Sequence, residues 1–180
     1  MNTSVRNPLP SLNSHRFRWL FLWLAQLTLV TGAQATETLT QVTKLSTRYD
    51  IQHYIRVADA ETLLARMGAE GSIATTEGLT LIAKYVEANF QANAEFGPVP
   101  IETLSAEVDD QFVYIEQMTS PTVSGVLPMQ LELESRLLQD LDSQAISYIE
   151  LHAGPQPLLM RVATGRPVNI SNSAVQPIFY

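Results

Sequence analysis

The sequence predicts a mainly β domain of the α+β class: an antiparallel, β-sandwich-like fold of about seven strands with two helices inserted after the second strand. Several short segments alternate apolar and polar residues with a period of two, as half-buried strands do. One longer segment has a single apolar stripe at helical spacing. Turn residues separate the segments. An open α+β sheet with helices on one face is the alternative.

The first two strands are expected before residue 58. Residues 36–46 have spaced apolar positions and predict a short strand or an ordered arm. Residues 48–57 alternate strictly, so a half-buried strand is expected. One face of that strand carries Ile51, His53, Ile55 and Val57, and the other carries Asp50, Gln52, Tyr54 and Arg56.

The two helices are expected next. Asp59 is a candidate N-cap for a short helix over residues 60–67, which stops at Gly68. A second helix is expected from Thr75 or Thr76 to about Gln91, and its apolar stripe should lie against a sheet. The stripe consists of Leu79, Ile82, Ala83, Val86 and Phe90.

The remaining strands are expected as two hairpins and one separate strand. Asp109-Asp110 is the expected turn between strands over 101–108 and 111–117. Gly154-Pro155 is the expected turn between strands over 145–152 and 157–162. Alternating leucines predict a further strand over 129–134.

Three other segments carry weaker signals. Gly97-Pro98 predicts a turn, and residues 137–144 predict a helical turn. From Gly165 onward the chain is polar without a clear period. We therefore expect a single globular β-rich domain over 36–168 and a loose C-terminal tail over 169–180.

The first 35 residues have the three parts of a cleaved secretory signal peptide. Arg16 and Arg18 are basic, residues 19–30 are apolar, and Ala33-Gln34-Ala35 is a cleavage site. A membrane-spanning helix needs roughly 20 apolar residues, so the short apolar part favours cleavage over anchoring. The expected location is the periplasm of a Gram-negative bacterium.

Composition excludes several classes of protein. Without residues 1–35, 8 basic residues face 18 acidic ones, so the net charge is about −10. Such a charge disfavours binding to nucleic acid and attraction to anionic membranes, and it favours solubility. Membrane insertion after signal cleavage is not expected. The absence of cysteine excludes disulfides, thiol enzymes and zinc ribbons.

Two histidines and two carboxylates are the candidate site residues. His53 lies on the apolar face of its strand, which is typical of a buried, hydrogen-bonded core histidine. Alternatively, it is a metal ligand or a base near Asp59 and Glu61. His152 precedes a turn and is the other metal candidate. Sequence support for a metal site is weak, because no HxH, HxxxH or HExxH spacing is present.

The order of these segments resembles a family of small exported bacterial proteins of unknown function, often called orphan proteins. The resemblance covers roughly residues 39–168. It implies export and a shared fold, without an established activity. Members carry further histidines at the places held here by Ala58 and Thr62, so this chain would lack most of those ligands. The matching motifs are Ile51-x-His53, Asp59-Ala60-Glu61, Tyr85-Val86-x-x-x-Phe90, Asp110-x-Phe112-Val113-Tyr114 and Leu138-x-Asp140-Leu141-x-x-Gln144.

The expected function is that of an exported, soluble, non-enzymatic binding or accessory module with a protein partner in the envelope. No nucleophile motif and no glycine-rich phosphate loop is present, so neither a catalytic residue nor an organic cofactor is predicted. A periplasmic metal-binding protein that uses His53 is the alternative, and a carboxylate-dependent hydrolase is a second one. A binding module would use an exposed sheet face or an edge strand.

Overall fold

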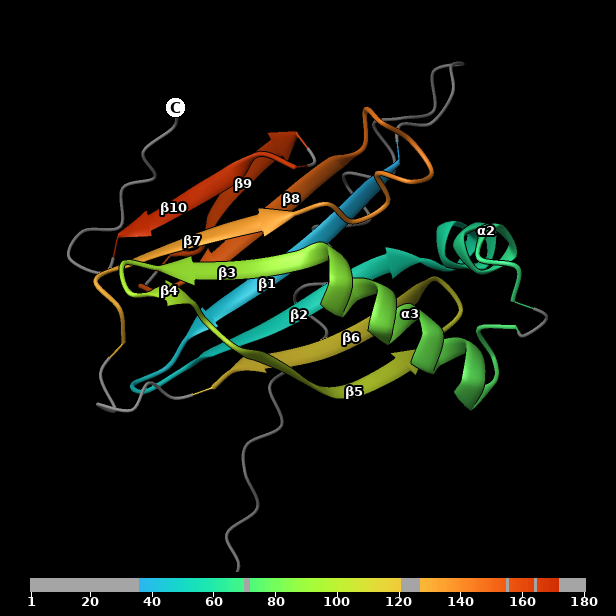
Figure 1. The fold of residues 1–180 in the computed structure, drawn as a ribbon, viewed down its shortest axis with the longest axis horizontal. Coiled ribbons are helices and arrows are strands. Elements are labelled where there is room, and N and C mark those ends of the chain that lie inside the picture. Colours follow the sequence, from blue (N-terminus) through green and yellow to red (C-terminus); the bar gives the residue numbers. More distant parts are fainter. Residues whose placement is uncertain (1–35, 70–71, 121–126, 155, 164, 172–180) are drawn as a thin grey trace, which may run out of the picture. The chain divides into compact units, whose positions relative to one another are not determined.

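The computed structural model describes residues 36–69, 72–120, 127–154, 156–163 and 165–171 (Figure 1). The predicted signal peptide over 1–35 lies outside the described residues, as does the predicted tail from residue 172 onward. The described part is mainly β, with two helices after the second strand, as predicted. In that part of the chain, no helix is long and apolar enough to cross a membrane.

Six strands form the larger sheet, in the order β5-β6-β2-β1-β8-β9. Neighbouring strands are antiparallel except β1 and β8, which are parallel. The sheet is therefore mostly antiparallel, as predicted. The one parallel pair arises because the chain passes through the smaller sheet before it returns as β8, and parallel neighbours need such a crossover. The strands are β1 (Glu37–Lys44), β2 (Tyr49–Arg56), β5 (Ile101–Val108), β6 (Phe112–Thr119), β8 (Ile146–His152) and β9 (Leu158–Ala163).

Four strands form the smaller sheet, in the order β10-β7-β3-β4. The sequence predicted only β7 among them. Gly97-Pro98, expected as a turn, pairs with β3, and β10 runs beyond the expected domain end at residue 168. Val168 and Ile170 are buried and pair with Leu133 and Leu131, which gives this polar segment its place in the sheet. The strands are β3 (Phe90–Ala94), β4 (Gly97–Pro98), β7 (Gln130–Ser135) and β10 (Pro167–Ser171).

The first helix, α2 (Val57–Arg66), starts directly at the end of β2, earlier than predicted. Arg56 occupies its N-cap position without a side-chain cap, and Asp59 lies in the first turn instead. A carboxylate there is favourable, because the N-terminal end of a helix is partly positive. The predicted stop is confirmed: Gly68 has a φ of 70°, the left-handed conformation that ends many helices.

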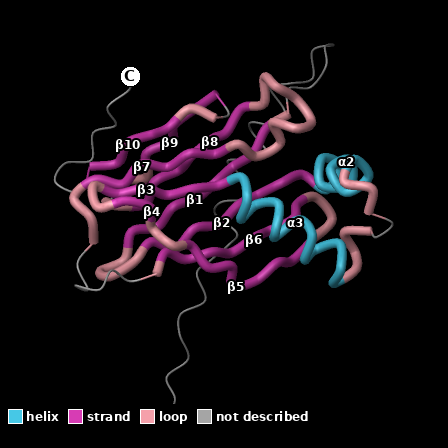
Figure 2. The backbone as a smooth tube through the Cα atoms, viewed as in Figure 1, coloured by secondary structure: helices cyan, strands magenta, loops and turns pink. Residues whose placement is uncertain are grey.

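The second helix, α3 (Thr76–Asn89), packs on β5 and β6 (Figures 1 and 2). The Thr75 hydroxyl accepts a hydrogen bond from the backbone N–H of Gly78 at 3.1 Å, so Thr75 caps the helix. Gly78 is buried against the preceding loop, and a Cβ there would lie 2.2 Å from the Ser72 carbonyl oxygen. The helix ends at Asn89, because Phe90 turns to extended backbone and starts β3 instead of closing the helical stripe.

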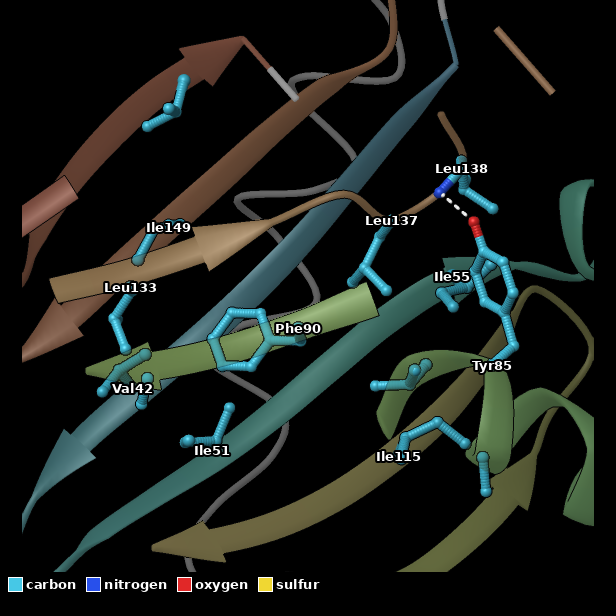
Figure 3. Close-up of a cluster of buried hydrophobic side chains, with 14 of the residues drawn as sticks. Val42, Ile51, Ile55, Tyr85, Phe90, Ile115, Leu133, Leu137, Leu138 and Ile149 are labelled. Atoms are coloured by element: carbon cyan, nitrogen blue, oxygen red, sulfur yellow. Dashed lines mark hydrogen bonds between the residues drawn. The ribbon is translucent and has the colours of Figure 1, made fainter. Parts of the chain in front are cut away.

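The core lies where the inner face of the larger sheet meets the smaller sheet and α3 (Figure 3). Residues 137–144, expected as a helical turn, form successive turns in which Leu138 has a φ of 61°. The Tyr85 hydroxyl from α3 accepts the Leu138 N–H at 2.8 Å and holds this strained residue in place. The labelled side chains of the cluster are Val42, Ile51, Ile55, Tyr85, Phe90, Ile115, Leu133, Leu137, Leu138 and Ile149.

Candidate functional site

His53, the first predicted site residue, is a fully buried core histidine on the inner face of β2. Its Nδ1 lies 2.9 Å from the Thr40 hydroxyl, and its Nε2 lies 3.0 Å from Oε1 of Gln117. Gln117 donates its amide N–H to Thr103, so its Oε1 accepts from Nε2–H and Nδ1 accepts from Thr40. Both ring nitrogens are therefore occupied within the core.

The environment of His53 favours the neutral imidazole. Burial lowers its pKa from 6.5 to about 4, and the hydrogen bond to Gln117 opposes only part of that effect. The ring also packs edge-on against Phe90 of the smaller sheet, with 4.6 Å between ring centroids. These contacts fit a structural role for His53 as a side chain that packs between the two sheets.

The predicted partners of His53 do not join it. Asp59 accepts a hydrogen bond from the Arg56 guanidinium at 2.7 Å, and Glu61 is exposed on α2. His152 ends β8 on the opposite, outer face of the larger sheet, and its Nε2 lies 3.5 Å from the Glu150 carboxylate. Among the described residues, no group of three or more His, Cys, Asp and Glu side chains is placed to hold a metal ion.

The outer face of the larger sheet carries an aligned row that the sequence did not reveal. We call it the tyrosine row: Tyr114 of β6, Tyr54 of β2, Leu39 of β1 and Tyr148 of β8. Strand register places each of these residues opposite the next. At about 4.8 Å between strands, the row extends roughly 14 Å across four strands. Tyr54 and Tyr114 meet edge to face, with 5.2 Å between ring centroids.

A second row runs beside the first, one step along the strands. We call it the glutamine row: Glu116 of β6, Gln52 of β2, Gln41 of β1 and Glu150 of β8. A tyrosine hydroxyl joins the two rows, because Oη of Tyr54 lies 2.8 Å from Oε1 of Gln41 and 2.7 Å from Oε1 of Gln52. The Gln41 amide donates to Glu150 at 2.7 Å, and the Gln52 amide donates to Glu116 at 3.4 Å.

The two carboxylates of the glutamine row make the surroundings of Tyr54 negative. Burial, followed by the charges of Glu150 and Glu116, raises the pKa of Tyr54 to about 12. In the described part of the chain, the ion pairs are Arg48–Asp50, Arg56–Asp59, Arg136–Glu134 and His152–Glu150. Neither Lys nor Arg among the described residues therefore pairs with the glutamine row.

The sequence predicted only the β2 part of this outer face. The alternation of apolar and polar residues in β2 placed Gln52 and Tyr54 on the face opposite His53. Gln41, Glu116 and Glu150 stand in strands far apart in the chain, and no local pattern marks them.

No family model matches the chain, and no curated protein matches it significantly.

Proposed function

We propose that this protein is an exported, soluble, non-enzymatic binding module that works by contact in the bacterial envelope. The outer face of the larger sheet is its contact surface. One observation carries the proposal: four neighbouring strands align a tyrosine row beside a row of carboxylates and amides. The opposite face of the same sheet is filled by core side chains and is not available to a partner.

The chemistry of the two rows suits recognition. Tyrosine offers a large, rigid surface with a polar end, and it is enriched at the centre of protein interfaces. The amides and carboxylates are already held by hydrogen bonds among themselves. A partner therefore meets side chains in fixed positions, and binding costs less conformational entropy than it would on a mobile surface.

Site-specific photo-crosslinking tests this proposal. A photoreactive amino acid is placed at Thr43 or Met118, which flank the glutamine row on the outer face. Matched controls place it at Lys84 or Glu87, which are exposed on α3. In an envelope extract, the two outer-face positions are expected to capture the same partner and the α3 positions to capture none. Equal capture at all four positions, or capture from α3 alone, would rule out the outer face as the contact surface.

A further inference from the structure

The glutamine row is rich in hydrogen-bond acceptors. Each end is a carboxylate, which only accepts hydrogen bonds when ionised. Glu150 therefore orients the Gln41 amide so that its N–H group faces the carboxylate, and Glu116 orients Gln52 in the same way. Each glutamine then turns its carbonyl oxygen toward the middle of the row.

Both carbonyl oxygens point at one hydroxyl group. Oη of Tyr54 lies 2.8 Å from Oε1 of Gln41 and 2.7 Å from Oε1 of Gln52. A tyrosine hydroxyl has a single proton and cannot donate fully to both oxygens. One hydroxyl group therefore serves two carbonyl oxygens at the centre of the row, between two carboxylates, and both oxygens can accept a further hydrogen bond.

A partner group that fits this centre brings hydrogen-bond donors and tolerates negative neighbours. A guanidinium group has five N–H donors and no acceptor, carries a permanent positive charge and stacks on aromatic rings. Tyr54 and Tyr114 provide the rings beside the row, and cations are attracted to the faces of such rings. Glu116 is exposed and can form a charge-assisted hydrogen bond to the same group.

We propose that the centre of the glutamine row binds an arginine side chain from an extended, basic segment of a protein partner. This inference rests on the proposed function and specifies the chemistry of the partner. The two rows run across four strands, which suits a partner segment in an extended conformation. The chain is strongly acidic, so long-range electrostatic attraction favours its encounter with a basic partner segment.

An NMR titration of the full chain tests the inference with a defined probe. The probe is the blocked tripeptide Gly-Arg-Gly, and the matched control peptide has citrulline in place of arginine, which keeps the shape and removes the charge. The arginine peptide should shift the side-chain amide signals of Gln41 and Gln52 saturably, and less so as salt is raised. E116Q should weaken its binding on the order of tenfold, because one charge-assisted partner is lost. E87Q, on exposed α3, should leave the affinity unchanged.

Three outcomes would overturn the inference. The citrulline peptide could bind as tightly as the arginine peptide, or E116Q could leave the affinity for the arginine peptide unchanged. In the third outcome, a chitooligosaccharide or calcium shifts the amide signals of Gln41 and Gln52 and the arginine peptide does not. If the arginine peptide does not bind while the positions of Thr43 and Met118 still crosslink to a partner, the outer face remains the contact surface and only the proposed arginine ligand is refuted. If the outer-face positions capture nothing, the proposed function itself fails.

Discussion

His53 should make the stability of this protein depend on pH in a way that can be worked out from its surroundings. The imidazole is fully buried, accepts a hydrogen bond from the Thr40 hydroxyl and donates one to the Gln117 side chain. Burial lowers its pKa from 6.5 to about 4. The unfolded chain therefore binds the proton more tightly than the folded protein does, so folding is favoured while the ring is neutral.

The size of the effect follows from the two pKa values. Each pKa unit between folded and unfolded states corresponds to about 1.4 kcal/mol. With a folded-state pKa of about 4 against 6.5, His53 is expected to account for a loss of about 3 kcal/mol of unfolding free energy at acid pH. The contribution is complete above pH 6.5 and is lost as the pH falls through the folded-state pKa near 4.

The assay is urea unfolding of the wild type and H53Q at several pH values from 4 to 8. Glutamine does not titrate. The difference in unfolding free energy between wild type and H53Q at each pH therefore reports the protonation of the imidazole, because the contributions of the carboxylates cancel. At neutral pH, H53Q should be less stable by about 1–3 kcal/mol, because a buried hydrogen-bonded site is disturbed. As the pH falls to 4, that gap should close or reverse.

T40V is the matched control, since it removes one hydrogen bond from the same site and keeps the titrating ring. Its curve should fall with pH as the wild-type curve does. If the wild type and H53Q instead run parallel from pH 4 to 7, the ring does not titrate as its burial requires, and the reasoning is refuted.

Three other substitutions test single features of the fold. G78A should lower the melting temperature, because the new Cβ would lie 2.2 Å from the Ser72 carbonyl oxygen, and this clash outweighs the better helix propensity of alanine. G154A is the control: its Cβ would have no atom within 4 Å, so the melting temperature should change little. Y85F removes the acceptor for the buried Leu138 N–H and should cost about 1–3 kcal/mol in urea unfolding; an unchanged midpoint would contradict that role. T75A removes the N-cap of α3 and should cost about 1 kcal/mol in the same assay, whereas a neutral result would mean that another group satisfies the Gly78 N–H.

Elements whose signals are local were predictable. The alternation of β2 reports which residues face inward, and it placed His53 on the buried side and Tyr54 on the other. The Asp109 turn was also correct: its carboxylate accepts the N–H groups of Gln111 and Phe112 at 2.7 and 2.8 Å. Turn and strand patterns depend on neighbouring residues, so a single sequence carries them.

The smaller sheet and the end of α3 were not predictable in this way. Phe90 continues the helical stripe in sequence, yet it starts β3 because that strand pairs with β7, some 40 residues later. The polar segment of β10 becomes a strand only because Val168 and Ile170 find places beside Leu133 and Leu131. Tertiary pairing overrode the local preference in both cases.

The sequence by itself determined the class of fold, the inward face of β2 and the acidic, cysteine-free character of the chain. Only the tertiary structure decided which strands are neighbours, and with them the outer face. Gln41 and Glu150 are 109 positions apart and Gln52 and Glu116 are 64 apart, yet they form one row. Side-chain alternation is a property of a single strand, whereas strand order and register are set by packing among distant segments, which no local pattern records.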